Sequence, residues 1–264
     1  MSRSPEEVED LKRRVAEITS WYHAIDLGDG VETPGTFRMA DYDKDYDFPE
    51  SLKGVRVLDV GAANGYHCSV FDRLGADEVV ALEMPRWESQ DWTPRNRRLY
   101  EEKSDEERKY IDDAVLDAGF DLVVEELGCK NVTRVRDVIY NLNPEEHGQF
   151  DIVFCGSMLM HVRDPVLGMH AMRSVCKPDG CILISVAMFE SAKYGIPDDV
   201  PIARFAGEWD QCNWWQMSPA GLRQLLTACD FTRIEWENQF LLEDTQSRFE
   251  DPTYVVRARP RADD

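Results

Sequence analysis

Residues 55–65, VRVLDVGAANG, constrain the fold more than any other part of the chain. An apolar run that ends in glycine predicts a buried strand over 55–60, then a tight turn and a helix that begins near Tyr66. Gly61 has no Cβ, so the backbone there can turn sharply or come close to a ligand. The first turn of the helix would direct free N–H groups at whatever lies on the loop.

A second strand, predicted over 78–82, ends at Glu83, eighteen residues after Gly65. An acidic residue at this place suits two hydrogen bonds to the hydroxyls of a ribose. The loop has the spacing G-x-x-x-G and no Lys or Arg, unlike the dinucleotide and P-loop patterns, and it suits a pyrophosphate poorly. Asp59 lies close to where a cationic amine could be held. Strand, loop and acid together indicate a site for a nucleoside that carries an amino-acid tail. The alternative is an ordinary strand–turn–helix unit without a ligand.

Predicted strands and helices alternate along most of the 264 residues, and two strands follow one another at the end. Strands are predicted over 55–60, 78–82, 132–136, 149–155, 181–186, 231–236 and 254–259. Helices are predicted over 6–22, 66–74, 105–118, 165–176 and 219–229, with a further helical stripe at 120–127 and a turn at 177–180. This order predicts an α/β fold, a Rossmann-like doubly wound sheet of seven strands whose last strand is antiparallel.

The same pattern divides the chain into an N-terminal helix and lid arm over residues 1–50 and one domain over 51–264. An insertion at 189–217, rich in Trp and Tyr, follows the fifth strand and is expected on the substrate side. Ligands of such sheets bind at the carboxyl ends of the parallel strands, where the strand order reverses.

The segment LDVGAANGYH resembles motif I of class I S-adenosylmethionine (SAM) methyltransferases, usually D/E-x-G-x-G-x-G, with Ala63 in place of the middle glycine. Together with WYHAIDLGDGVETPG, GSMLMHVRDP and MSPAGLRQLLTACDF, it makes the chain similar, from the arm to residue 236, to the tRNA wobble-uridine carboxymethyl transferases. Those enzymes have a long basic N-terminal region where this chain has a short acidic one. Met160 and Val162 stand where they have Tyr and Arg, and only Arg163 is retained. The resemblance therefore implies a relative that uses ordinary SAM on a small molecule.

The resemblance also implies a SAM pocket, with S-adenosylhomocysteine as the product. The residues expected at the methionine end are Asp59, Gly61, Ala63, Asn64 and Gly65. Glu83 is expected to hold the ribose. The residues expected near the adenine are Met84, Asp137 and Val138, and a turn cap is the alternative for Asp137. Gly156 and Ser157 are expected to line the cofactor beside the fourth strand.

Two histidines are candidates for a general base, because histidine can exchange a proton near neutral pH. His161 follows the fourth strand, and its alternative is a structural histidine bonded to backbone. His23 lies in the arm, and its alternative is an exposed lid residue. His67 and His170 fall in predicted helices and are expected to be structural.

The expected reaction is in-line displacement at the sulfonium methyl by a substrate oxygen or nitrogen, in which alignment of the reacting groups lowers the barrier. The residues expected to contact the substrate are Tyr22, Arg163, Tyr194, Trp214 and Trp215. For the tryptophans the alternative is packing of the insertion onto the domain, and for Arg163 it is an ion pair with Asp164.

The net charge of −21 disfavours nucleic acid as a partner, because nucleic-acid binders neutralise phosphates with basic patches. No apolar run is long enough to span a bilayer and the first residues do not resemble a secretory signal, so we expect no membrane association and a cytoplasmic location. Seven cysteines at irregular spacing predict reduced thiols and no metal site. Two alternatives stay open: a tRNA-modifying transferase that uses carboxylated SAM, and a non-catalytic SAM-binding protein.

Overall fold

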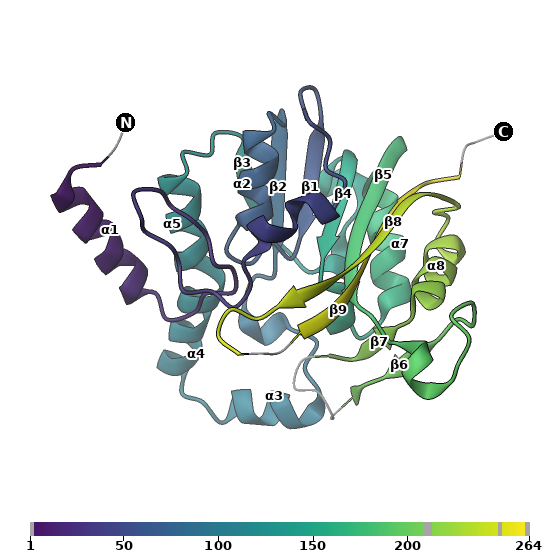
Figure 1. Ribbon diagram of the computed structural model, residues 1–264. Helices are drawn as coiled ribbons and strands as arrows, with labels where there is room; N and C mark the ends of the chain where they lie inside the picture. The colour runs from purple at the N-terminus through teal and green to yellow at the C-terminus, as the bar shows by residue number, and fades with distance from the viewer. Residues whose placement is uncertain (1–2, 208–212, 248–249, 262–264) are drawn as a thin grey trace.

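The computed structural model describes residues 3–207, 213–247 and 250–261. Its centre is a seven-stranded sheet in the order β3-β2-β1-β4-β5-β9-β8 (Figure 1). The strands of this sheet are β1 (Arg56–Val60), β2 (Glu78–Glu83), β3 (Val132–Arg136), β4 (Phe150–Gly156), β5 (Cys176–Ala187), β8 (Arg233–Glu243) and β9 (Glu250–Arg259). Strands β1 to β5 pair in parallel, and β9 runs antiparallel between β5 and β8. The predicted Rossmann-like sheet with an antiparallel last strand is confirmed.

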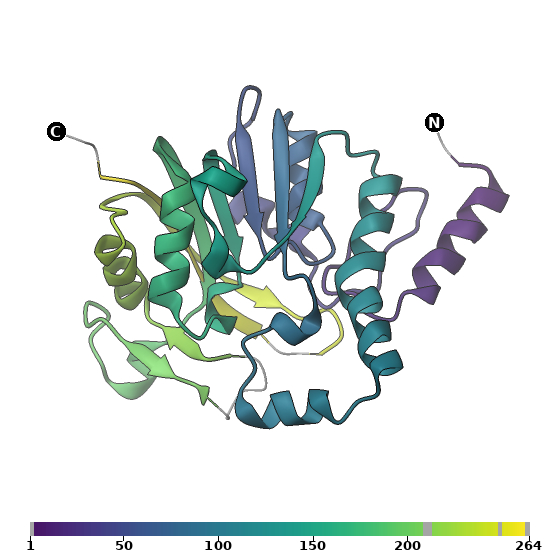
Figure 2. The ribbon, with the colours of Figure 1, turned by 180° about the vertical axis from the view of Figure 1, so that it is seen from behind.

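Helices cover both faces of the sheet. The α-helices are α1 (Pro5–Glu17), α2 (Tyr66–Arg73), α3 (Pro94–Glu101), α4 (Asp105–Asp112), α5 (Ala118–Glu126), α6 (Pro144–His147), α7 (Pro165–Val175) and α8 (Pro219–Ala228). On one face, buried side chains of α1, α2 and α5 pack with Val57 and Val79. On the other, those of α7 and α8 pack with Leu58 and Val80, and Figure 2 turns α7 toward the viewer.

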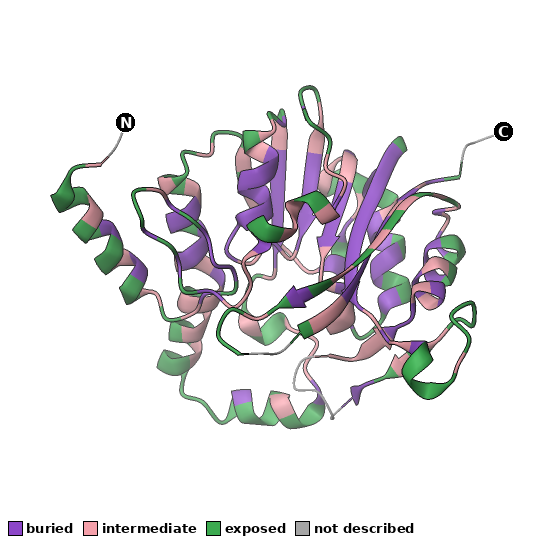
Figure 3. Ribbon diagram, viewed as in Figure 1, coloured by how far each residue is buried: buried purple, intermediate pink, exposed green. Residues whose placement is uncertain are grey.

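Strand β1 shows why the sheet lies at the centre of the core. Val57 and Leu58 point to opposite faces, and both are fully buried, so the strand needs a continuous apolar run. Figure 3 shows the same burial along the central strands, while the helices expose their outer sides. Asp59 and Glu83 break the apolar pattern near the carboxyl ends of β1 and β2, where both are buried. Because burying a carboxyl group costs free energy, these two acids mark a functional edge of the sheet.

Several predicted boundaries differ from the structure, including those of the last two strands, which extend over Arg233–Glu243 and Glu250–Arg259. The helix predicted over 6–22 ends at Glu17, since Ile18 is extended and the Trp21 indole donates to the Val15 carbonyl at the helix end. The stretches 105–118 and 120–127 form α4 and α5, joined by a π-helical turn at Asp113–Asp117.

The turn predicted at 177–180 lies inside β5. Between the pairs Phe150–Cys176 and Ile152–Cys181, strand β4 advances by two residues while β5 advances by five. The extra residues form an irregularity of the ladder and do not end the strand.

The segment between α1 and the 3-10 helix η1 (Met39–Asp45) forms an arm across the carboxyl edge of the sheet. It folds back on itself through bridges between Asp26 and Glu32 and between His23 and Phe37. Phe37 also bridges to Asp244, just after β8, so the arm is held to the far side of the sheet.

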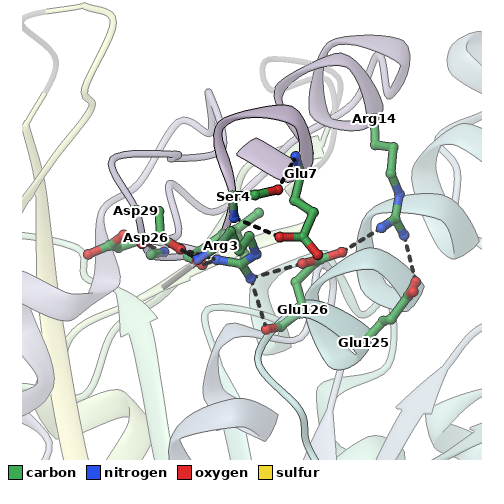
Figure 4. A network of polar contacts seen from close by, with 10 residues as sticks. Arg3, Ser4, Glu7, Arg14, Asp26, Asp29, Glu125 and Glu126 are labelled. Atoms are coloured by element: carbon green, nitrogen blue, oxygen red, sulfur yellow. Dashed lines mark hydrogen bonds and ion pairs between the residues drawn. The ribbon is translucent and has the colours of Figure 1, made fainter. Parts of the chain in front are cut away.

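Helix α1 is fastened to α5 by ion pairs (Figure 4). Glu126 accepts from both Arg3 and Arg14, and Arg14 also pairs with Glu125. Leu11 and Val15 add buried apolar contact on the same side of α1. The start of the arm is therefore anchored to the core.

The insertion at 189–217 contains the 3-10 helix η6 (Ser191–Tyr194) and a small hairpin of β6 (Ala203–Phe205) and β7 (Trp215–Met217). Within the described parts of the chain, no helix is both long and apolar enough to cross a membrane.

Candidate functional site

A small cavity lies where the strand order of the sheet reverses, between β1 and β4. Its volume of about 20 Å³ is room for one water molecule. The residues that line it are Tyr22, His23, Met39, Tyr46, Asp59, Gly61, His67, Phe154, Gly156, Ser157 and Leu242. Six of these were singled out from the sequence as site residues, and the fold brings them together from the arm, β1 and β4.

The loop after β1 has the backbone geometry that its glycines suggest. Gly61 has φ +81°, and a Cβ on it would come within 2.7 Å of Met158 Cγ. Ala63 has φ +48°, in the left-handed region that favours glycine. This explains why the pattern that the loop resembles has glycine at this position. Gly65, with φ +79°, forms the N-cap of α2.

Glu83 ties the end of β2 to this loop. One carboxylate oxygen accepts from the backbone N–H of Ala63 at 3.2 Å, and the other accepts from that of Met84 at 2.9 Å. Burial raises the pKa of Glu83, against the effect of those hydrogen bonds and of Arg136. An ionised carboxylate accepts about four hydrogen bonds, so Glu83 retains capacity for a ligand's hydroxyl groups.

Asp59 is the deepest acid of the site. It is 2 % exposed, and its Oδ2 accepts a hydrogen bond from Cys68 Sγ at 3.2 Å. Burial raises the pKa of Asp59 to about 7, with a smaller contribution from the charge of Glu83. A carboxyl group in this state would be returned to its ionised form by a nearby cation.

Asn64 connects the loop to the arm. Its Oδ1 accepts from the backbone N–H groups of Tyr22, at 2.6 Å, and His23, at 3.4 Å. Thr33 donates to the carbonyl of His23 at 2.7 Å, which fixes the same stretch from the other side. The side chain of Asn64 therefore positions the arm directly over the glycine loop.

The buried rings of His23 and His67 lie edge to face, at an interplanar angle of 87° and with their centroids 5.9 Å apart. Among the described residues, His23 Nδ1 and His67 Nε2 have no hydrogen-bond partner. Burial lowers the pKa of His23 to about 3. Burial also lowers the pKa of His67, with a further contribution from His23. Both imidazoles are therefore neutral at physiological pH.

The end of β4 forms the opposite wall. Ser157 has φ +49°, and its N–H donates to the carbonyl of Ser185, on β5, at 3.0 Å. The Ser185 hydroxyl lies 3.2 Å from the Tyr46 hydroxyl. A Cβ on Gly156 would come within 2.9 Å of the Phe154 ring, so glycine is required for this close packing.

The residues expected near an adenine lie at the ends of β2 and β3. The N–H of Asp137 donates to the Glu83 carbonyl at 3.1 Å. Its carboxylate accepts from the Val138 N–H, at 2.8 Å, and from Asn141. The Met84 carbonyl accepts from Arg136. Asp137 thus caps the turn after β3, the alternative use that its position suggests.

The other residues singled out from the sequence lie outside the cavity lining. His161 lies in a 3-10 turn, Leu159–His161, and is half-buried. Arg163 is exposed and pairs with Asp91 at 3.7 Å. The indole of Trp214 donates to the Asp91 carbonyl, and that of Trp215 donates to the Arg163 carbonyl. Trp215 thus joins the insertion to the loop after β4, and Trp214 joins it to the segment between β2 and α3.

Tyr194 is exposed and stacks on Phe189, with ring centroids 4.9 Å apart. Five lining residues were missed at the sequence level: Met39, Tyr46, His67, Phe154 and Leu242. Tyr46 and Leu242 are far from the motifs in sequence. His67 had a signal, since it follows the glycine loop within the first turn of α2.

Comparison with known proteins assigns the chain to a family. Residues 37–244 match the family model described as a methyltransferase domain. The chain is 30% identical over 135 residues to a ubiquinone biosynthesis O-methyltransferase of Xanthomonas campestris pv. campestris (strain B100), covering 51% of this chain and 44% of the relative. A protein of the same name from Neisseria meningitidis serogroup C (strain 053442) is 32% identical over the same coverage. The chain thus spans less than half the length of the curated relatives that it matches.

Two solved structures share the fold over nearly the whole chain. The N-terminal domain of EvdMO1, in a structure with S-adenosylhomocysteine (SAH) and D-fucose, has a TM-score of 0.61 and 18% identity, covering 98% of this chain and 100% of that one. The Burkholderia thailandensis 1,6-didemethyltoxoflavin-N1-methyltransferase has a TM-score of 0.52 and 16% identity, covering 98% and 92%. The chain therefore belongs to the methyltransferase family and has the class I fold of SAM-dependent methyltransferases.

Proposed function

We propose that this protein transfers the methyl group of SAM to an oxygen or nitrogen of a small-molecule acceptor. The observation that carries the proposal is the arrangement of Gly61, Asp59 and Glu83 around one loop at the reversal of strand order. It combines close backbone approach, a buried acid for a cation and a second acid for paired hydroxyls.

The residues of the loop suit SAM better than a dinucleotide. The loop carries no Lys or Arg that would pair with a pyrophosphate. Asp59 would hold the amine of the methionine end, and Glu83 would accept from the ribose hydroxyls with the oxygens that now face Ala63 and Met84. Gly61, Asn64, Gly65, Gly156 and Ser157 would shape the rest of that end, and Asp137 and Val138 would lie beside the adenine.

When bound, SAM supplies an electrophilic methyl group. The contribution of the protein is to align the acceptor atom with it and to exclude water, which lowers the barrier without further chemistry. The arm suits the second task, because Tyr22 and His23 already close the cavity above the loop.

A small acceptor is supported by the relatives and by charge. The curated relatives are named O-methyltransferases of ubiquinone biosynthesis, and the two structural neighbours were solved in the presence of D-fucose and with bound 1,6-didemethyltoxoflavin. The net charge of −21 disfavours RNA. Met160 and Val162, in place of Tyr and Arg, favour ordinary SAM over a carboxylated form.

His23 and His161 are the candidate proton acceptors, and the cavity favours His23 because His23 lines it. Tyr22 is the candidate acceptor contact from the arm. The other candidate contacts with the acceptor come from the insertion and the loop after β4. They are Arg163, Tyr194, Trp214 and Trp215. If His161→Ala keeps turnover within about tenfold (about 1.4 kcal/mol), His161 is not the proton acceptor.

The test is transfer of labelled methyl from SAM in the presence of small hydroxyl and amine compounds or of bulk tRNA. We expect label in the small-molecule fraction, and its loss in Glu83→Ala. Label in the tRNA fraction alone would overturn the small-molecule proposal. SAH binding without any transfer would favour a non-catalytic SAM-binding protein.

A further inference from the structure

Two buried imidazole nitrogens at the cavity have no partner among the described residues: His23 Nδ1 and His67 Nε2. His23 is 5 % exposed and His67 is 6 % exposed, so bulk water does not compensate them. A buried polar atom without a hydrogen bond costs free energy, and native proteins keep few of them. Both rings line the same cavity, beside Gly156 and the loop after β1. Their unused hydrogen-bonding capacity, at a cavity with room for one water molecule, fits a single oxygen atom that both nitrogens contact.

We propose that His23 and His67 together hold the acceptor's reactive group, which is an uncharged hydroxyl. This inference rests on the proposed methyl transfer and narrows its acceptor to an alcohol or a phenol. The ring centroids are 5.9 Å apart and both rings line one cavity, so a single oxygen between them can contact a nitrogen of each ring.

The chemistry of a hydroxyl matches a pair of neutral imidazoles. A hydroxyl has one donor and two acceptor sites, so it can donate to the bare nitrogen of one ring and accept the N–H of the other. A carboxylate or phosphate would need a cationic partner, and the residues that line the cavity include no Lys or Arg. An aliphatic amine arrives protonated at neutral pH. Burial lowers the pKa of both imidazoles, so neither can take that proton.

The same geometry accounts for the proton in the transfer step. The acceptor oxygen forms a bond to the methyl carbon, while the carbon–sulfur bond breaks and its electron pair stays on sulfur. As the new bond forms, the hydroxyl becomes a protonated ether, which is a far stronger acid than an imidazolium. Its proton passes to the ring nitrogen that it already contacts. A weakly basic imidazole is sufficient for this late transfer.

The other side chains around the two histidines support an uncharged acceptor group. Aromatic rings enclose His67, with the Phe154 ring at 4.6 Å and the Tyr46 ring at 5.5 Å. Asp59 is the acid in the cavity lining, and in the proposed function it pairs with the cofactor's amine.

The experiment uses the full chain and the variants His67→Phe, His67→Gln and His23→Asn, with His170→Gln as the control because His170 is exposed on α7. His67→Phe fills the same space without a polar atom, and His67→Gln restores a polar group near Nε2. His23→Asn keeps a polar atom near Nδ1. Each protein is tested for thermal stability, for SAH binding and for methylation of phenol, catechol, methyl glucoside, aniline and glucosamine.

We expect wild type to methylate a hydroxyl compound. In His67→Phe the KM for that compound should rise at least tenfold, while the Kd for SAH stays within twofold and the melting temperature is equal or higher. His67→Gln and His23→Asn should lie between wild type and His67→Phe, and His170→Gln should match wild type. A gain in stability together with a loss of acceptor binding is not expected of a merely structural histidine.

Three results would overturn the inference: an unchanged KM in His67→Phe, a large loss of stability in that variant, or methylation of only the amines or of no hydroxyl compound by a wild type that binds SAH. A wild type that binds no SAH would instead overturn the proposed function, and this inference with it.

Discussion

The charge state of Asp59 should link pH to cofactor binding and to stability in opposite directions. The carboxyl is buried, and its pKa rises from an ordinary 3.8 to about 7 in the folded protein. Between these values the folded state binds more protons than the unfolded state, so stability that is present at low pH is lost as pH rises. Raising the pH from 6 to 7.5 should cost the ligand-free protein about 1.3 kcal/mol through this group.

Cofactor affinity should change the other way. If Asp59 pairs with the amine, only the ionised carboxylate binds well. With a pKa of about 7, the affinity for SAH should rise about eightfold between pH 6 and 7.5. Over this range the amine of the ligand keeps most of its positive charge.

Calorimetric titration of SAH and denaturant unfolding at the two pH values measure both effects. Asp59→Asn resembles the protonated acid in shape and should lose most of both slopes. Any slope that remains belongs to Glu83, whose pKa is also raised by burial. An SAH affinity that does not change with pH in wild type, or the same slope in Asp59→Asn, would refute the pairing of Asp59 with the amine.

Further predictions concern the loop and the arm. Gly61→Ala should lower the free energy of unfolding by about 2 kcal/mol or more, because Gly61 has a positive φ and a Cβ there would contact the loop after β4. For Ala63→Gly the free energy of unfolding should stay within about 1 kcal/mol of the wild-type value. Denaturant unfolding measures both. Asn64→Ala leaves two backbone N–H groups of the arm without their acceptor, which should cost about 1–3 kcal/mol and make residues 18–37 the first site of limited proteolysis; cleavage there at the wild-type rate would contradict the role of Asn64. Glu126→Ala should cost about 1 kcal/mol and speed hydrogen exchange in α1, while Glu125→Ala, at a more exposed carboxylate, should change little; equal effects would contradict the assigned anchor.

The parts of the fold that follow from short-range pattern were predictable. The strand and glycine loop of residues 55–65, the acid at the end of β2 and the final hairpin of strands are each encoded within a few residues. Buried parallel strands need continuous apolar runs, and such runs are visible without any tertiary information. The end of α1 was less predictable, because it depends on the Trp21 indole reaching back to the Val15 carbonyl.

The cavity was only partly predictable, because it is built from segments far apart in sequence. Tyr46 reaches it from the residue just after η1 and Leu242 from β8, and no local pattern links them to the glycine loop. His67 was interpreted as structural because it lies in a helix. Its burial beside His23 and its unpartnered nitrogen become visible only when the arm is folded over the loop.

The most direct test of the central claim is calorimetric titration of SAH into wild type, Glu83→Ala and the control Glu78→Ala. Glu78 lies on the same strand but at its opposite end, paired with Arg56. We expect micromolar binding to wild type and Glu78→Ala, and a weakening of at least about 100-fold (about 2.7 kcal/mol) in a Glu83→Ala protein whose melting temperature shows that it is folded. No binding to wild type, or equal binding to a folded Glu83→Ala, would contradict the SAM site described above.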